Sequence, residues 1–330
     1  MQTDKEALLA IFSGSGKAEF IPDIFDHYKA LPFPGERYFP LDGSFDPYGT
    51  GPDAWGVLWT NLGPDPVVDG NMVAKDFRLF DDITQWRDKV HFPPLEHMPI
   101  GPVLNGIAAS MHVDREQDVV GVLLLSGQFE RLNEMIGMED ALCAFYEEPE
   151  EMHAFMDAMC EYKLKCIDLA WEAIHPDVIY MHDDWGANNN MFFSPEIWRE
   201  FIKPNEQKYA DRIHSYGMLY HHHSCGFIEQ IVPDLVEIGV DVLDPLMVRN
   251  DVTGILKEYG TRITIAGGIN NQMIDAPGAT EEAIRAEVRR AIDEYAPLGR
   301  YIPDYIPTNH RTLAIFRDEV VKYAGNGSIN

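Results

Sequence analysis

The chain has 330 residues, of which 45% are hydrophobic and 24% charged, a composition typical of globular proteins and not of disordered or fibrous ones. Its 54 acidic and 26 basic residues give a formal net charge of −28, which repels phosphate backbones and argues against a nucleic-acid partner. The longest apolar run, residues 119–125, is too short to cross a bilayer, so no membrane association is expected.

The N-terminus has acidic residues early and lacks a basic region followed by an apolar stretch, so a secretory signal is not expected. Four cysteines (Cys143, Cys160, Cys166 and Cys225) are too few for a disulfide framework in a chain of this length. Reduced thiols agree with a cytoplasmic location, which is the localisation that we expect.

Residues 1–118 have an irregular pattern, with proline, glycine and aromatic residues interleaved. The aromatic residues of this part, Tyr48 and Trp59 among them, are too apolar to remain in water. The pattern therefore predicts loops and short strands packed on a core, not a flexible linker.

From residue 119 onward the pattern becomes regular, and strands and helices alternate. Apolar runs predict strands beginning at residues 119, 177, 218, 240, 262 and 300, and helical patterns cover residues 129–174, 194–217, 227–239, 251–260, 280–299 and 309–324. Ser194 and Pro195 have the chemistry of a helix start, and Gly217 that of a helix end. This alternation requires a parallel sheet covered by helices.

The strand–helix units are similar in size, and the chain has no glycine-rich phosphate loop of the kind that open doubly wound sheets carry. We therefore predict an α/β fold, a (β/α)8 TIM barrel with an elaborated N-terminal segment. Residues 1–330 are predicted to form a single domain, with an irregular part at 1–118 and regular βα units at 119–330.

Polar residues end five of these apolar strands, at the face where barrel enzymes place their active sites. In chain order they are Asp183, Asp184 and Trp185; His221, His222, His223 and Cys225; Asp244; Gly267 and Gly268; and Asp304. Polar loops would explain any one of these endings, but five in register favour a shared pocket.

Alternation along the strand at 218–223 places His221 and His223 on one side and His222 on the other. His223 and Cys225 can then point into the same barrel mouth, and an imidazole nitrogen and a thiolate are ligands that zinc favours. A covalent Cys225 nucleophile with a histidine base is a second reading of the same residues. The third reading is that these residues form an ordinary packed strand end with no chemical role.

Several longer stretches carry a family resemblance. They are "DVIYMHDDWGANNNMFFSPEIWREFIKP", "HSYGMLYHHHSCGFIEQIVPDLVEIGVDVLDPL", "GGINNQ" and "TEEAIRAEVRRAIDEYAPLGRYI", with "GTGPDAWGVLW" in the N-terminal part. Together they resemble the uroporphyrinogen decarboxylase superfamily. The branch that they resemble is that of the zinc-dependent corrinoid methyltransferases, which includes coenzyme M methyltransferases and the methyltransferase I components of O-demethylases.

This resemblance implies a (β/α)8 barrel, a Zn²⁺ ion held by His223 and Cys225, and a corrinoid (cobalamin) supplied by a corrinoid-binding partner protein. The chain departs from the branch at one point, because no cysteine follows Cys225 to complete the zinc site. Asp304 is our first choice for the missing metal ligand, with His310 and Asp184 as alternatives. The chain also lacks the N-terminal arginine cluster of the decarboxylase itself, which makes decarboxylation the minority reading.

Zinc with a single thiolate is a harder Lewis acid than zinc with several, and harder zinc prefers oxygen. We therefore expect a small-molecule methyl donor in which the methyl group is bound to oxygen, such as a methoxylated aromatic. Asp184 or His222 is predicted to protonate the leaving oxygen. The residues expected to contact the substrate are Asp183, Trp185, Tyr48 and Trp59.

Three other functions are compatible with the same sequence. A methylcobalamin-dependent methyltransferase acting on a thiol acceptor would keep the zinc and the corrinoid. A decarboxylase would need carboxylate-binding arginines, and a non-catalytic zinc protein would have a closed, four-ligand metal site.

Overall fold

A computed structural model describes residues 2–36, 50–63 and 70–324 of the chain. Tyr48, which the sequence predicts to contact the substrate, lies outside the described residues. No helix within the described ranges combines the length and the apolar character needed to cross a membrane.

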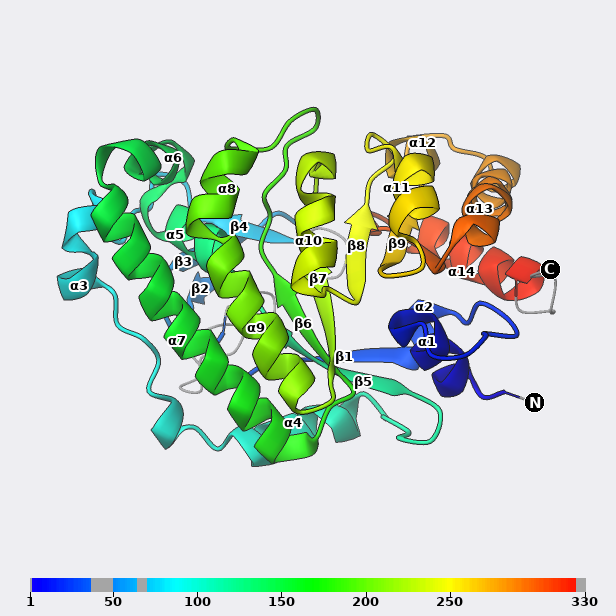
Figure 1. The fold of residues 1–330 in the computed structure, drawn as a ribbon, viewed down its shortest axis with the longest axis horizontal. Coiled ribbons are helices and arrows are strands. Elements are labelled where there is room, and N and C mark those ends of the chain that lie inside the picture. Colours follow the sequence, from blue (N-terminus) through cyan, green and yellow to red (C-terminus); the bar gives the residue numbers. More distant parts are fainter. Residues whose placement is uncertain (1, 37–49, 64–69, 325–330) are drawn as a thin grey trace.

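Seven parallel strands form the main sheet, and their order in the sheet is their order in the chain (Figure 1). They are β1 (Tyr28–Pro32), β5 (Val119–Leu124), β6 (Val178–His182), β7 (Leu219–His223), β8 (Val242–Leu246), β9 (Thr264–Gly268) and β10 (Tyr301–Asp304). A sheet in which each strand pairs with the next one along the chain is the winding of a (β/α) barrel. The predicted fold class is confirmed, with seven paired strands in the described residues where the prediction had eight.

The edge strands β1 and β10 do not pair with each other within the described ranges, and helices pack across this seam. Asp23, which caps α2 (Ile24–His27), accepts a hydrogen bond of 2.7 Å from Nε of Arg317 in α14 (His310–Ala324). The ring of Phe25 also lies edge-on to those of Tyr305 and Phe316. The first and last parts of the chain are therefore held together beside the sheet.

Helices connect the strands in the order that the sequence predicts. Between β5 and β6 lie α5 (Gln128–Ile136), α6 (Met138–Glu147) and α7 (Pro149–Ile174), and between β6 and β7 lie α8 (Pro195–Phe201) and α9 (Lys203–Ser215). The later helices are α10 (Val232–Ile238), α11 (Val252–Tyr259), the short α12 (Asn271–Ile274) and α13 (Glu281–Tyr295).

The predicted helix at 194–217 has the expected ends but is divided in two. Ser194 Oγ accepts a hydrogen bond from the amide of Ile197, and Gly217 adopts φ +75° after the last turn. The division falls at Ile202, two residues before Pro204, which has no amide hydrogen to continue the helical ladder. Gly137, at φ +88°, and Pro149 similarly divide the 129–174 region into three helices, where two were expected.

The N-terminal part contains α1 (Asp4–Ser13), α3 (Trp86–Lys89) and α4 (Ile100–Ser110), and the short antiparallel strands β2 (Gly51–Pro52), β3 (Leu58–Asn61) and β4 (Asn71–Val73). The sequence predicts loops and short strands for this region; β2 to β4 agree with that, whereas α1, α4 and the barrel strand β1 were not predicted. Buried residues of this part, such as Phe33 and Trp59, belong to the same hydrophobic cluster as the barrel strands. That residues 1–330 form a single domain stays a prediction.

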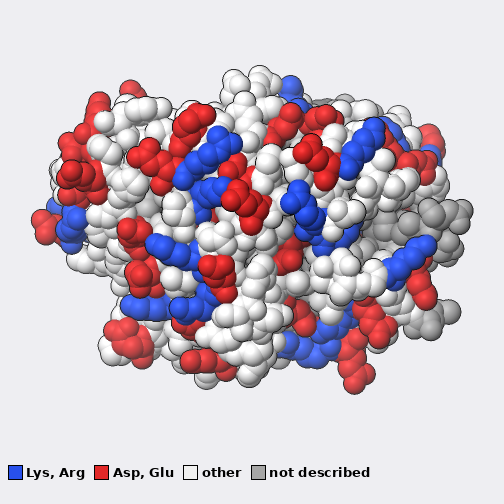
Figure 2. Space-filling model, in the orientation of Figure 1, with Lys and Arg blue, Asp and Glu red and all other residues white. Residues whose placement is uncertain are grey.

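Acidic and basic side chains are interspersed on the face of the molecule that Figure 2 shows, in spite of the large net charge. Many of them form ion pairs between neighbouring helices. Lys208 of α9, for example, lies 3.3 Å from Asp157 of α7, and both side chains are exposed. Such exposed pairs stabilise little, about 0–1 kcal/mol each.

The register of the parallel strands brings the polar strand ends together. His182 pairs with His223 across β6 and β7, and His223 pairs with Asp244 across β7 and β8. Residues at equal height on adjacent parallel strands share a face of the sheet. The carboxyl ends of these three strands therefore form one polar edge.

Candidate metal centre

The three histidines of β7 alternate between the two sides of the sheet, as strand geometry requires. His221 and His223 both reach the carboxylate of Asp244: His221 Nε2 lies 2.8 Å from Oδ1, and His223 Nδ1 lies 3.2 Å from Oδ2. His222 points to the opposite side and stacks on Trp185 with ring centroids 4.2 Å apart.

Asp244 is the residue that orients this group of histidines. It is buried, and it also accepts a hydrogen bond of 2.9 Å from the Tyr180 hydroxyl. Burial alone would raise the pKa of Asp244, but the imidazoles of His223 and His221 outweigh it and hold that pKa well below its usual range. Burial likewise opposes the charge on His223, yet Asp244 and Cys225 raise the pKa of His223 well above its ordinary value.

With Nδ1 held by Asp244, His223 directs Nε2 toward two further candidate ligands. Nε2 lies 3.4 Å from Cys225 Sγ and 3.6 Å from Asp184 Oδ1. Asp184 Oδ1 in turn accepts a 2.6 Å hydrogen bond from the Cys225 amide. A histidine whose second nitrogen is bound to a carboxylate is the usual arrangement of a metal-ligating imidazole.

Gly226 allows the loops after β6 and β7 to come this close. It adopts φ +86°, and a Cβ atom at this position would lie 2.2 Å from the carbonyl oxygen of Gly186. Glycine is needed here both for the left-handed backbone and for the contact between the two loops. The positions of Asp184 and Cys225 depend on that contact.

His182, at the end of β6, is a functional candidate that the sequence reasoning missed. Its ring lies parallel to that of His223 with centroids 4.0 Å apart, and its Nδ1 lies 2.7 Å from Glu130 Oε2. Among the described residues, His182, Asp184 and His223 are the one group of three or more metal-ligating residues whose ligand atoms all lie within 4.8 Å of one another. Alternation along β6 places His182 on the same side as Tyr180, two residues before it. Together with the β6–β7 register, which sets His182 beside His223, this would have identified His182 as a candidate.

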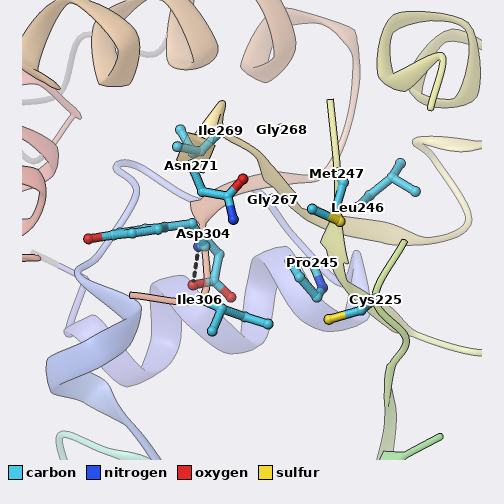
Figure 3. Close-up of a pocket in the computed structure, with 11 residues that line it drawn as sticks. Cys225, Pro245, Leu246, Met247, Gly267, Gly268, Ile269, Asn271, Asp304 and Ile306 are labelled. Carbon is cyan, nitrogen blue, oxygen red and sulfur yellow. Dashed lines mark hydrogen bonds between the residues drawn. The ribbon is translucent and has the colours of Figure 1, made fainter. Parts of the chain in front are cut away.

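Asp304 lies across a small pocket from Cys225. Figure 3 shows the two side chains pointing into the pocket from opposite walls, with Met247 and Asn271 above them. Asp304 Oδ1 accepts a 2.8 Å hydrogen bond from the Tyr305 amide. Burial, together with the nearby Asp244 carboxylate, raises the pKa of Asp304 well above its usual value.

Two other predicted site residues lie in different surroundings. Asp183 is buried, and its carboxylate oxygens accept hydrogen bonds from the amides of Phe129 and Glu130 at the start of α5, at 3.2 and 2.8 Å. Burial, with a contribution from the Glu130 carboxylate, raises the pKa of Asp183 to about 8. Trp59 is 1% exposed, and its Nε1 donates to Asp53 in the N-terminal part.

His222 and Trp185 lie together on the side of β7 away from His223. Both side chains are fully buried, and Trp185 also packs edge-on against Trp198 of α8. Burial, together with the nearby His223, keeps the pKa of His222 well below its usual value, so the imidazole is neutral. Contacts of Asp183, Trp185 and Trp59 with substrate stay predictions, as does proton transfer by His222.

The donor set at the polar edge is suited to a divalent metal ion. It offers imidazole nitrogen, a thiol and carboxylates, which are the ligand types of zinc sites. Within the described residues, no lysine or arginine contacts Asp184, Asp244 or Asp304. Asp244 is the buried one of the three, and a buried carboxylate needs a proton, a metal ion or a basic side chain to balance it; His221 and His223 lie against it.

Comparisons with known proteins agree with this architecture. The family model described as uroporphyrinogen decarboxylase (URO-D) matches residues 72–304. The solved structure of a methyltransferase from Methanosarcina mazei superposes with a TM-score of 0.67 over 98% of this chain and 99% of that one, at 15% identity. At that identity the likeness speaks for the fold alone.

Two curated proteins are similar in sequence over part of their length. Methylcobamide:CoM methyltransferase MtaA of Methanosarcina barkeri is 26% identical over 170 residues, which are 50% of this chain and 45% of that protein. Methylated-thiol–coenzyme M methyltransferase of Methanosarcina mazei is 25% identical over 161 residues, 49% of this chain and 41% of that protein. The matched part is less than half of each relative. Since the family model covers more than half of the present chain, the protein belongs to the uroporphyrinogen decarboxylase family.

Proposed function

We propose that this chain is a zinc-dependent methyltransferase that moves a methyl group from an oxygen-bound donor to the Co(I) corrinoid of a partner protein. The observation that carries the proposal is the orientation of His223, whose Nδ1 is bound by Asp244 while Nε2 faces Cys225 and Asp184. The similarity to two methyltransferases supports the reaction class, although it covers only half of this chain.

His223 and Cys225 are the two metal ligands that the proposal requires. Asp304 is the third ligand proposed from the sequence, and it faces Cys225 across the pocket (Figure 3). Asp184 and His182 compete for the same role, because their ligand atoms already lie within 4.8 Å of those of His223. A single thiolate among nitrogen and oxygen ligands would give the hard Lewis acid that favours an oxygen-bound methyl group.

When bound, the metal would supply Lewis acidity toward the leaving oxygen. In the overall transfer the bond between methyl carbon and oxygen breaks, its electron pair stays with oxygen, and the Co(I) electron pair forms the new bond to carbon. The leaving oxygen then needs a proton. With Asp304 as the third metal ligand, we assign its delivery to Asp184, which lies beside His223 Nε2, and keep His222, on the other side of the strand, as the alternative.

The donor class proposed is a methoxylated aromatic. The pocket beside Cys225 is lined by apolar side chains, among them Leu246, Met247 and Ile306, with Asn271 and Asp304 as its polar side chains. This lining supports a donor with an apolar body, but the volume of the pocket, about 20 Å³, is too small to hold the ring itself.

Methyl transfer to a thiol is the second candidate, since both curated relatives are named as coenzyme M or thiol enzymes. Decarboxylation of a polycarboxylate is disfavoured, because the described lining of the pocket contains neither arginine nor lysine. A thiol acceptor and a methyl ether donor are distinguished by the direction in which the corrinoid changes: the first consumes methyl-Co(III), and the second produces it.

The metal is tested by measuring zinc in wild type, His223→Ala and Cys225→Ala by elemental mass spectrometry. Exposed residues of the same kind, in His153→Ala and Cys143→Ala, are the matched controls. We expect zinc near one equivalent in wild type and in both controls, and a strong loss in the two site variants. Equal zinc in all five proteins would refute the metal site.

The same measurement on Asp304→Asn, Asp184→Asn and His182→Ala identifies the third ligand. The reaction is tested by mass spectrometry of the corrinoid after incubation with cob(I)alamin and methoxyarenes, methanol or methylamines. Methylcobalamin formed only with a methoxyarene and only by zinc-loaded protein is the expected result. Carbon dioxide release without methyl transfer would instead support the decarboxylase.

A further inference from the structure

A second cavity lies at the opposite end of the barrel strands from the metal centre. Its walls come from the segment after α1 and from the residues that lead into β10, and its volume is about 190 Å³. Arg300 lies in the wall immediately before β10 begins, whereas Asp304 ends that strand at the metal centre. The two sites are therefore separated by the length of β10.

Two cations, Lys17 and Arg300, line this cavity. Arg300 donates from Nη1 to the carbonyl oxygen of Phe12 at 3.1 Å, and its Nε is buried without a hydrogen-bond partner. Neither Lys17 nor Arg300 forms an ion pair with a carboxylate of the described part of the chain. Burial lowers the pKa of Arg300, and the carboxylate of Asp241, which is hydrogen-bonded to His214 and to the Tyr220 amide, offsets this only in part.

This unpaired arginine contrasts with the more deeply buried cations of the molecule. Arg131 and Lys163, both with fully buried side chains, lie 2.7 Å from Asp53 and 2.9 Å from Glu36. Although the chain has 54 acidic residues, no carboxylate of the described ranges forms an ion pair with Arg300, and Asp241 acts on it only from a longer distance. A partly buried cation with unused donors is stabilised by an anion that supplies the missing acceptors.

The remaining walls are apolar and come from Ala10, Ile11, Ala18 and Ile21. A volume of this size accommodates a small ring, since a cavity of about 150 Å³ holds benzene. Inorganic phosphate would leave the apolar walls unused, whereas a carboxylate on an apolar body would use both kinds of wall.

We propose that this cavity is a binding site for a small organic carboxylate with an apolar body, its carboxylate on Arg300 and Lys17 and its body against Ile11 and Ile21. Arginine presents two parallel N–H groups that match a carboxylate. The inference does not depend on the proposed methyl transfer, because it uses no residue of the metal centre.

Isothermal titration of the zinc-loaded full chain with benzoate tests the proposal, with benzyl alcohol and inorganic phosphate as comparison probes. We expect benzoate to bind at millimolar concentration or below and each comparison probe to bind at least about tenfold more weakly. Arg300→Met and Lys17→Met remove the charges, and each should weaken benzoate at least about tenfold. Ala18→Leu fills the cavity without changing any charge, and it should also weaken benzoate binding at least about tenfold.

Lys165→Met is the matched control, because this exposed lysine lies on α7, on the far side of the molecule from α1 (Figure 1). Zinc content should be unchanged in all four variants. If Arg300→Met fails to fold for lack of the bond to Phe12, Lys17→Met and Ala18→Leu still decide the question. Absence of benzoate binding to wild type, or binding unaffected by all the cavity variants, would overturn the proposal.

Discussion

The metal centre and a second group of residues at α5 both contain buried carboxylates, Asp244 in the first and Glu36 and Asp53 in the second, but the two sites balance this charge in different ways. In the second group, which we call the ionic cluster (Glu36, Asp53, Arg131, Glu134 and Lys163), Arg131 Nη1 lies 2.7 Å from Asp53 and 3.1 Å from Glu134. Lys163 lies 2.9 Å from Glu36. The ionic cluster supplies its own cations.

The metal centre has no such cations. Asp184, Asp244 and Asp304 contact histidines, a tyrosine and backbone amides, and no lysine or arginine of the described residues reaches them. Glu206 represents a third solution, because burial raises its pKa to about 8 and a proton neutralises it. The comparison teaches that carboxylates balanced by histidines and protons, and not by lysine or arginine, with a thiol beside them, are a place to look for a metal ion.

The largest effect of a substitution is expected in the ionic cluster, where lysine and arginine side chains already balance the carboxylates. Arg131→Met removes the central cation of the ionic cluster and leaves Asp53 and Glu134 buried without it. We expect the free energy of unfolding to fall by about 3–5 kcal/mol in urea denaturation. The exposed Arg262→Met should change it by less than about 0.5 kcal/mol. A loss no larger than that of the control would show that the ionic cluster is not balanced by Arg131.

Glu206→Gln tests neutralisation by a proton. The folded pKa of about 8 lies above the unfolded value of roughly 4.3, so the folded protein holds a proton that the unfolded chain releases. The contribution of Glu206 to the free energy of unfolding is therefore present at low pH, and it is lost as the pH rises toward 8.

Between pH 5 and pH 8, wild type should therefore lose more unfolding free energy than Glu206→Gln, by about 3–4 kcal/mol. The exposed Glu147→Gln is the control and should follow the wild-type curve. Parallel curves for wild type and Glu206→Gln would mean that Glu206 is ionised in the folded protein.

Asp244→Asn tests whether Asp244 orients His223 at the metal centre. Asparagine keeps the size of the side chain but weakens the hold on His223 Nδ1 and removes a negative charge. We expect zinc affinity to fall by about 10–100-fold in competition with a chelator. The exposed Asp211→Asn should leave it unchanged. Unaltered affinity in Asp244→Asn would exclude Asp244 from orienting a metal ligand.

His222→Phe separates the two sides of β7. The substitution keeps the ring that stacks on Trp185 but removes the contacts with Tyr220 at 3.1 Å and Glu206 at 3.4 Å. We expect a loss of about 1 kcal/mol in unfolding free energy and unchanged zinc. Loss of zinc together with an unchanged unfolding curve would place His222 at the metal centre.

Much of the barrel is determined locally. The apolar runs that become β5 to β10 are recognisable in the chain, and Ser194 and Gly217 mark helix ends by their own chemistry. Strand alternation predicted that His223 and Cys225 point the same way, but β7 ends at His223, and Cys225 is positioned by the loop contact between Gly226 and Gly186. The division of the 194–217 helix at Ile202 was overlooked, although Pro204 is its local cause.

Only the tertiary structure decided which residues of different strands and helices contact each other. Glu130 reaches His182 from α5, and Asp244 reaches His223 from the next strand, at separations of 52 and 21 residues. Arg131 and Asp53, 78 residues apart, meet in the same way. Sequence periodicity determines which face a side chain occupies, whereas its neighbour depends on strand register and helix packing. Those are set by the whole core and not by any single segment.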